Sequence, residues 1–280
     1  MPVSATNISE FATQGFTLAR RLFSDEEVED LREHFLWINR EHRQVSDNIT
    51  DESDPLAKYP RVGQPHRWDE TSLNWLIDPR LNEWMTAILG REPYAVQTMF
   101  YYKPPGARGQ ALHQDQFYLR VEPGACVAAW MAVDRCDEEN GCLFIVTGTH
   151  DIPVLCTVDA DTDASFVNDT VELPPGFEPI PLIMDPGDVL FFNGQLVHGS
   201  YPNSSADRFR CAMIGHYIAA EARAVHEHYH PVLRMDGSQL DFGVSEQGGP
   251  CGVWVDRDGE PVAMLEGVET RQEHRSRRRD

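Results

Sequence analysis

The chain of 280 residues has no long apolar run and no paired-cysteine motif. A bilayer span needs roughly 20 consecutive apolar residues, and the sequence contains no such run. The N-terminal stretch MPVSATNISEF lacks a charged region followed by an apolar one, so we expect no secretory signal. The six cysteines form no C-x-x-C pair, so we expect reduced, mostly buried thiols and a cytoplasmic protein.

Basic residues are scarce, because 24 Lys and Arg stand against 45 Asp and Glu, a net charge of −21. Such a field repels phosphate backbones and anionic lipid surfaces, so we expect neither nucleic acid nor a membrane as a partner. Hydrophobic residues make up 41% and aromatic residues 10% of the chain, enough for a packed core. We therefore expect a globular protein, and nothing in its composition indicates an oligomeric state.

Helical patterns occur in the first third of the chain. Ser24 and Glu27 fit a capping box, and the apolar residues from Val28 to Ile38 follow helical spacing, which predicts a helix over about 25–43. A second helix is predicted in DPRLNEWMTAILG, with Pro79 at its start and Gly90 at its end. The acidic stretch DNITDESDP between them is predicted to be an exposed loop.

After Gly90 the sequence changes to short β-branched and aromatic runs separated by Pro and Gly turns. This pattern predicts a mainly β protein, a jelly roll or barrel with flanking helices. We expect one domain over 1–280, with a helical flank at about 20–90, a core at about 91–220 and an extension at 221–280. The polar insertion 157–179 is expected to be a lid or flap. A hairpin is predicted to turn near Asp258 and Gly259, and the charged tail 271–280 is expected to be disordered.

The run ALHQDQFYL, residues 111–119, contains two good metal ligands. On a strand, side chains alternate between faces, so His113 and Asp115 are predicted to share one face and Gln114 the other. His198 follows a predicted strand far along the chain and supplies a third ligand. Two histidines and one carboxylate can hold ferrous iron with three coordination positions open.

The chain resembles the phytanoyl-CoA dioxygenase-like (PhyH) branch of the Fe(II)/2-oxoglutarate oxygenases over roughly residues 11–220. The resemblance rests on the strings QTMFYYKPPG, LHQDQFYL, AAWMAVDRCDEENGCLFIVTGTH, PGDVLFFNGQLVHGS and RFR, in that order. It implies a double-stranded β-helix, a cupin-like jelly roll. It also implies Fe(II), 2-oxoglutarate and O2 as cofactor and cosubstrates, with release of succinate and CO2.

The same resemblance implies roles for individual residues. His113, Asp115 and His198 correspond to the iron ligands. Arg210 corresponds to the arginine that binds the distal carboxylate of 2-oxoglutarate, which suits a guanidinium fork; Arg208 is the alternative. The further 2-oxoglutarate positions that it implies are Ser200, Gln97, Met99 and Trp130. Related halogenases replace the ligand carboxylate with a small residue, so Asp115 implies oxygenation, usually hydroxylation.

Several other residues have two possible roles. The loop YPRVGQPHRWDE, residues 59–70, brings His66, Arg67 and Trp68 either over the iron as substrate contacts or into a structural anchor. Phe117 and Tyr118 either line the pocket or pack in the core. In VHEHYH, alternating histidines His226, His228 and His230 would share a strand face and bind a metal, or remain exposed polar groups. His216 is expected to pack or hydrogen-bond structurally.

We therefore predict a dioxygenase that hydroxylates a small-molecule metabolite, such as a natural product, an amino-acid-like molecule or another polar compound. The acidic composition disfavours a CoA ester and favours a neutral or cationic substrate. Three alternatives remain. A non-redox cupin-type binding protein would share the fold but would not need Arg210. A zinc hydrolase would leave the same arginine unexplained. A pseudo-enzyme would be expected to lack a ligand.

Overall fold

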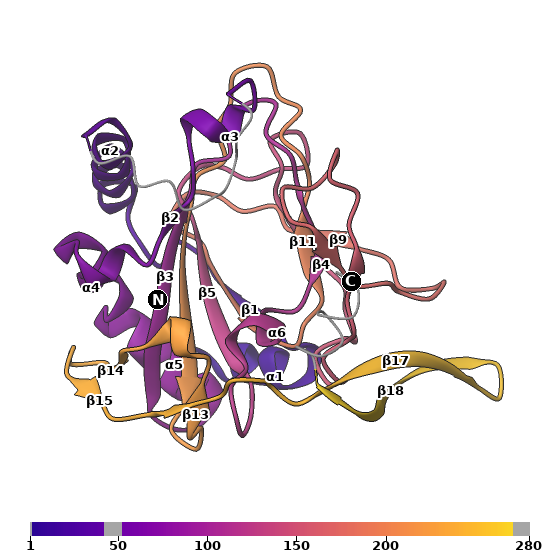
Figure 1. Ribbon diagram of the computed structural model, residues 1–280. Coiled ribbons are helices and arrows are strands. Elements are labelled where there is room, and N and C mark those ends of the chain that lie inside the picture. The colour runs from indigo at the N-terminus through magenta and orange to yellow at the C-terminus, as the bar shows by residue number, and fades with distance from the viewer. Residues whose placement is uncertain (1, 42–51, 271–280) are drawn as a thin grey trace.

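Two facing β-sheets form the body of the molecule, a jelly roll, as predicted (Figure 1). The computed structural model describes residues 2–41 and 52–270. The larger sheet has eight strands in the order β1-β10-β5-β12-β3-β14-β15, with β2 paired to β3, and the smaller has the order β4-β11-β6-β9. The strands of the larger sheet are β1 (Phe16–Ala19), β2 (Val62–Gly63), β3 (Pro93–Tyr101), β5 (Cys126–Ala132), β10 (Val189–Asn193), β12 (Ala212–Ala219), β14 (Val232–Arg234) and β15 (Gln239–Leu240). Those of the smaller sheet are β4 (Gln110–His113), β6 (Leu143–Ile145), β9 (Ile180–Pro181) and β11 (His198–Ser200).

Helices α2 (Asp25–Glu41), α4 (Glu70–Leu76) and α5 (Pro79–Leu89) cover the outer face of the larger sheet, on the side away from the smaller sheet (Figure 1). The helices are α1 (Ala5–Gln14), α2 (Asp25–Glu41), α3 (Pro55–Lys58), α4 (Glu70–Leu76), α5 (Pro79–Leu89) and α6 (Asp115–Leu119), with the 3-10 turns η1 (Pro65–Arg67) and η2 (Glu227–Tyr229). The capping box of α2 is confirmed: Ser24 N–H donates to Glu27 Oε2 at 2.8 Å, and Glu27 N–H donates to Ser24 Oγ at 3.3 Å. The predicted end of this helix, residues 42–43, and most of the predicted loop lie outside the described residues.

The central strand β5 shows how the two layers are built. All seven of its residues are buried. Val127, Ala129 and Met131 pack in the cluster beneath the helices, and Ala128 and Trp130 face the other cluster, between the sheets. A strand that is covered on both faces is continuously apolar, which explains the run CVAAWMA. Every second side chain of β5 therefore points into the space between the two sheets.

The sheet extends beyond the predicted core of 91–220. Strands β1 and β2 precede that range, and β14 and β15 follow it, yet all four join the larger sheet. The remaining strands form pairs: β7 (Val158–Asp159) with β8 (Asp169–Thr170), β13 (Ala224–Val225) with β16 (Gly243–Val244), and β17 (Pro250–Arg257) with β18 (Glu260–Thr270). The last pair is the predicted hairpin, and its turn has Asp258 and Gly259 at φ values of 58° and 88°. The predicted disordered tail lies outside the described residues.

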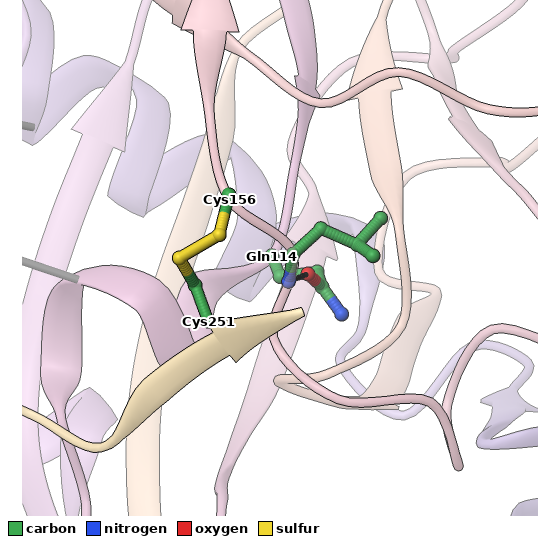
Figure 2. The surroundings of a disulfide bond; sticks show 4 residues. Gln114, Cys156 and Cys251 are labelled. Atoms are coloured by element: carbon green, nitrogen blue, oxygen red, sulfur yellow. Dashed lines mark hydrogen bonds between the residues drawn. A yellow bond between two sulfur atoms is a disulfide. The ribbon is translucent and has the colours of Figure 1, made fainter. Parts of the chain in front are cut away.

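The expectation that all cysteines are reduced is wrong for two of them. Cys156 and Cys251 form a disulfide that joins β17 to the loop after β6 (Figure 2). The partners are 95 residues apart, so only the folded chain brings them together. The other described cysteines are buried thiols that form no disulfide: Cys126, Cys136, Cys142 and Cys211. Among the described residues, no helix has the length and apolar character that a membrane crossing requires.

Candidate metal centre

The HQD run changes from strand to helix between its two candidate ligands. Strand β4 ends at His113, and helix α6 begins at Asp115, so the predicted strand is wrong beyond His113. Gln114 remains extended, with φ −123° and ψ 124°. Because of this extended residue, His113 and Asp115 still lie on one side, and the amide of Gln114 points away, where it accepts a hydrogen bond from Leu155 N–H at 2.7 Å (Figure 2).

Sheet pairing brings the third candidate ligand to the first two. Strand β11 runs antiparallel to β4, and His198 stands opposite His113. His113 Nε2 lies 3.6 Å from Asp115 Oδ1, and His198 Nε2 lies 3.7 Å from Asp115 Oδ2. One ligand atom from each of the three lies within 4.8 Å of the others, and all three residues are buried. The arrangement matches the two-His, one-carboxylate set expected for ferrous iron.

The hydrogen bonds of the two rings show that this cluster fits a cation. His113 Nδ1 lies 2.9 Å from the carbonyl oxygen of Ala111, and His198 Nδ1 lies 2.9 Å from that of Leu196. A carbonyl only accepts, so each Nδ1 carries the proton and each Nε2 presents a lone pair toward Asp115. Two lone pairs and a carboxylate repel one another unless a cation lies between them. Gln110 Nε2, 3.0 Å from His113 Nε2, would have to move aside for that cation.

His216 holds the carboxylate of this cluster from behind. Its Nε2 lies 3.1 Å from Asp115 Oδ2, across 101 residues of sequence, and its ring is buried. Burial alone would raise the pKa of Asp115, but the neighbouring His198 and His216 hold it well below its usual value. Burial also lowers the pKa of His198 to about 4. Both groups therefore have the protonation state of metal ligands, a carboxylate and a neutral imidazole.

The role of His216 was underestimated from the sequence. It was expected to be structural, and its side chain does form a hydrogen bond, but to a candidate metal ligand on the cavity wall. The sequence spacing contained one clue. Residues 210, 214 and 216 are separated by even numbers, so on an extended chain they face one side. Arg210, Ile214 and His216 all line the cavity.

Arg210 lies in the same cavity as the three candidate ligands. It precedes β12 by two residues rather than lying within the strand, and it is 3% exposed. Its Nε donates to Gly141 O at 3.0 Å, and its guanidinium lies 5.4 Å from the ring centre of Trp130. Among the described residues, no acidic side chain forms an ion pair with it. A buried guanidinium without an anion is unfavourable, so the site fits a carboxylate ligand.

The other predicted 2-oxoglutarate positions also reach this cavity. Gln97 and Met99 alternate along β3, Trp130 lies on β5, and Ser200 ends β11; all four line the cavity. Ser200 Oγ accepts hydrogen bonds from Lys103 Nζ at 2.8 Å and from Gln110 N–H at 3.2 Å. Burial and the nearby Arg210 hold the pKa of Lys103 well below its usual value. The alternative, Arg208, is a surface residue paired with Asp137 and Glu139, so the structure favours Arg210.

The cavity is large, about 1220 Å³, and the polar insertion forms part of its wall. Strands β7 and β8 pair within that insertion, and Phe166 N–H donates to Gly109 O at 3.0 Å. Phe166 and Asn168 from the insertion line the cavity together with Tyr101 and Tyr118, and the ring centres of Phe166 and Tyr101 lie 6.4 Å apart. The insertion thus lies where a lid or flap was expected.

Of the five predicted substrate residues, the structure places only Tyr118 on the cavity wall. His66 is buried, and its Nδ1 lies 2.8 Å from Thr98 Oγ1. Trp68 is 43% exposed, and Phe117 is buried beside Tyr118. Arg67 Nη2 donates to the carbonyl oxygens of residues 228 and 230, at 2.6 and 2.5 Å. None of these four side chains lines the cavity, and His66 and Arg67 instead tie together the segments around it.

The three alternating histidines near the C-terminus do not share a strand face. His226 caps η2 and accepts a hydrogen bond from His228 N–H at 3.1 Å. Among the described residues, His113, Asp115 and His198 form the one group with metal-binding geometry, and none of the three C-terminal histidines belongs to it. His228 and the following residue, Tyr229, line the cavity instead.

A jelly roll whose cavity holds two histidines, an aspartate and a buried arginine is typical of the iron- and 2-oxoglutarate-dependent oxygenases, and the chain is an enzyme of this class. Within that class, the chain belongs to the phytanoyl-CoA dioxygenase (PhyH) family, whose model matches residues 11–212. This confirms the resemblance that the sequence strings indicated.

Known proteins of this kind are similar to the chain in sequence and in fold. The peroxisomal phytanoyl-CoA dioxygenase of Bos taurus is 28% identical over 232 residues, which cover 77% of this chain and 68% of the relative. The epimerase SnoN, solved with Fe3+, alpha ketoglutarate and nogalamycin RO, has a TM-score of 0.66 at 17% identity, over 87% of this chain and 95% of that one. EctD from S. alaskensis, solved with 2-oxoglutarate and 5-hydroxyectoine, has a TM-score of 0.60 at 21% identity, over 79% of this chain and 78% of that one.

Proposed function

We propose that the protein hydroxylates a polar small-molecule metabolite, with conversion of 2-oxoglutarate and O2 to succinate and CO2. The observation that carries this proposal is the shared cavity: three converging ligand side chains and one buried arginine without an acidic partner among the described residues. A non-redox binding protein would need the three ligands but not the arginine.

Each residue of the site has a separate task in this proposal. His113, Asp115 and His198 would hold ferrous iron, which supplies the oxidising chemistry when bound. Arg210 would bind the distal carboxylate of 2-oxoglutarate through its guanidinium fork, and Ser200 would add a hydroxyl. His216 would keep the carboxylate of Asp115 oriented. Trp130 and Met99 would exclude water beside the keto acid.

The cavity indicates the type of substrate. At about 1220 Å³ it exceeds the usual size of small-molecule sites, roughly 300 to 1,000 Å³. Its wall combines aromatic residues such as Tyr101 and Phe166 with polar ones such as Asn168 and Asp169. SnoN and EctD, which share this fold, were solved with nogalamycin RO and with 5-hydroxyectoine, so the fold can hold more than one kind of compound. We infer a polar substrate with an apolar portion.

Anaerobic titration tests the cofactor assignment without knowledge of the substrate. Fe(II) and 2-oxoglutarate together should produce the visible charge-transfer band of the iron–keto acid chelate. His113→Ala should abolish the band. Arg210→Ala should raise the 2-oxoglutarate concentration at half-saturation by about 30-fold or more, since loss of one partner of a buried charged pair costs at least about 2 kcal/mol.

Arg208→Ala is the matched control, because Arg208 is two residues away and pairs with surface carboxylates. It should titrate like wild type. An Arg210→Ala protein with wild-type affinity for 2-oxoglutarate contradicts the assignment. Succinate release should then be measured across a panel of free amino acids, betaines, polyols and glycosylated or polycyclic natural products. Members that accelerate succinate release identify the substrate class.

We propose the cytoplasm as the location, because four cysteines are buried thiols that form no disulfide. The Cys156–Cys251 disulfide favours an oxidising compartment instead. Thiol alkylation in freshly lysed cells, followed by mass spectrometry, distinguishes the two: a cytoplasmic enzyme should yield alkylated Cys156 and Cys251.

A further inference from the structure

The short segment 226–230 forms part of the cavity wall, although it lies outside the residues that match the family model. That match ends at residue 212. The chain then completes β12, forms η2 at Glu227–Tyr229 and returns to the larger sheet as β14. His228 and Tyr229 both line the cavity that contains the candidate iron ligands. This part of the wall therefore lies outside the residues that the family model matches.

Three hydrogen bonds from the loop 59–70 hold residues 226–230 in place. Arg67 Nη2 donates to His228 O at 2.6 Å and to His230 O at 2.5 Å. Gln64 Nε2 donates to the same carbonyl of His228 at 2.7 Å. The loop 59–70, for which a substrate contact and a structural anchor were the two possible roles, thus binds the backbone of a segment about 160 residues further along the chain.

The same segment is connected to the metal centre. His226 N–H donates to Leu119 O at 2.9 Å, and Leu119 is the last residue of α6, the helix that begins at Asp115. Tyr229 packs in one apolar cluster with Leu119, Val225 and Val232. A backbone hydrogen bond and apolar packing, both to Leu119, therefore hold the ring of Tyr229 in a fixed position relative to helix α6 and Asp115.

The hydroxyl of Tyr229 has no hydrogen-bond partner among the described residues, although the residue is 93% buried. A buried tyrosine hydroxyl usually has a partner. The hydroxyl oxygen of Tyr229 also retains some accessible surface, so a ligand can reach it. Burial and the negative charge of Asp115 raise the pKa of Tyr229, so the phenol stays protonated and can donate or accept. An unpartnered hydroxyl on the wall of a ligand cavity is placed to bind a ligand.

We propose that Tyr229 is a specificity-determining residue, whose hydroxyl hydrogen-bonds a hydroxyl, amine or carbonyl group of the substrate beside the iron. Arg67 is the positioning residue that holds Tyr229 there through the carbonyls of His228 and His230. This inference rests on the proposed function and extends it, since it selects substrates with a polar group close to the oxidised carbon.

The placement of Tyr229 can be tested without a substrate. The protein is labelled with 3-fluorotyrosine, and the resonance of residue 229 is assigned by its loss in Tyr229→Phe. Co(II), a paramagnetic substitute for iron, should shift or broaden this resonance, and diamagnetic Zn(II) should not broaden it. Arg67→Met should reduce the effect of Co(II) at least twofold, and Arg67→Lys, which keeps a donor for both carbonyls, should restore most of it.

Tyr118 provides the internal control, because its ring centre lies 6.2 Å from that of His113. If Co(II) affects the resonance of Tyr118 but not that of Tyr229, the proposal is overturned. If Co(II) affects neither, and the iron–keto acid band is also absent, the proposed function has failed instead.

Kinetics then test specificity. Tyr229→Phe should leave the 2-oxoglutarate concentration at half-saturation of the charge-transfer band within twofold of wild type. It should lower kcat/KM at least tenfold for the panel members that stimulate wild type. Tyr94→Phe is the control, because Tyr94 packs against the same cluster but does not line the cavity. The Arg67→Met, Tyr229→Phe double variant should be no worse than Tyr229→Phe alone. Unchanged stimulation by every panel member in Tyr229→Phe overturns the proposal.

Discussion

Loss of the Cys156–Cys251 disulfide should destabilise the whole domain. The bond closes a loop across 95 residues, from the segment after β6 to strand β17. In the chain-entropy description, a cross-link over about 100 residues removes about 4.7 kcal/mol of freedom from the unfolded chain. Removal of native disulfides typically costs 2–5 kcal/mol. We therefore expect the Cys156→Ser, Cys251→Ser double variant to lose about 3–5 kcal/mol in its free energy of unfolding.

The contacts around the bond indicate that this stabilisation reaches the body of the protein. Cys156 N–H donates to Gly252 O at 2.9 Å, and Gly252 N–H donates to Val154 O at 2.7 Å. The adjacent Leu155 N–H donates to the side chain of Gln114, which lies between two candidate iron ligands (Figure 2). The hairpin, the loop and the metal centre should therefore unfold together.

Urea unfolding followed by tryptophan fluorescence measures the effect. Oxidised wild type is compared with wild type in excess dithiothreitol and with the double variant. The last two should have the same, lower midpoint, and a larger dependence on urea, because an uncrosslinked chain exposes more surface on unfolding. If oxidised and reduced wild type unfold at the same urea concentration, the hairpin does not belong to the cooperative unit and this reasoning is refuted.

Two further predictions concern hydrogen bonds of individual side chains. His216→Phe removes the donor to Asp115 Oδ2 but keeps a ring in the core, so it should weaken Fe(II) binding by about 10- to 100-fold; anaerobic titration with Fe(II) checks this, and unchanged affinity would show that His216 has no part in orienting the carboxylate. Glu27→Gln tests the link between α2 and α5, because hydrogen bonds from Arg80 lower the pKa of Glu27 to about 2. A carboxylate with a lowered folded pKa stabilises the protein above its unfolded pKa and loses that contribution as pH falls toward about 2. Since both side chains are more than one third exposed, we expect only about 1 kcal/mol at pH 7, and a difference between variant and wild type in urea unfolding that shrinks below pH 4.5; an equal difference at all pH values would contradict the charge-based explanation.

Patterns that span only a few residues were sufficient to predict the helix cap and the hairpin turn. The capping box of Ser24 and Glu27 and the turn at Asp258 and Gly259 depend on neighbours three or fewer residues apart. The spacing of His113 and Asp115 also predicted correctly that their side chains lie on one side. One extended residue separates them, even though the strand ends at His113. Such features are decided by backbone geometry alone.

Resemblance to a family extended the sequence prediction to distant residues. Residue type alone offered His198 as a third ligand, and the order of the family's strings supported this assignment and added Arg210 to the same site. Spacing alone would not have joined them. The helix that begins at Asp115 and the strands β1 and β14 of the larger sheet were not predicted, because their formation depends on neighbours that are remote in sequence.

Only the tertiary structure decided which side chains serve the site from a distance. Arg67 holds His228 across 161 residues, His216 reaches Asp115 across 101, and Cys156 meets Cys251 across 95. Each of these side chains could meet other partners in an unfolded chain, and no local sequence pattern distinguishes the native partner from the others. The packing of two sheets against each other selects one partner for each, because burial leaves polar groups few ways to complete their hydrogen bonds.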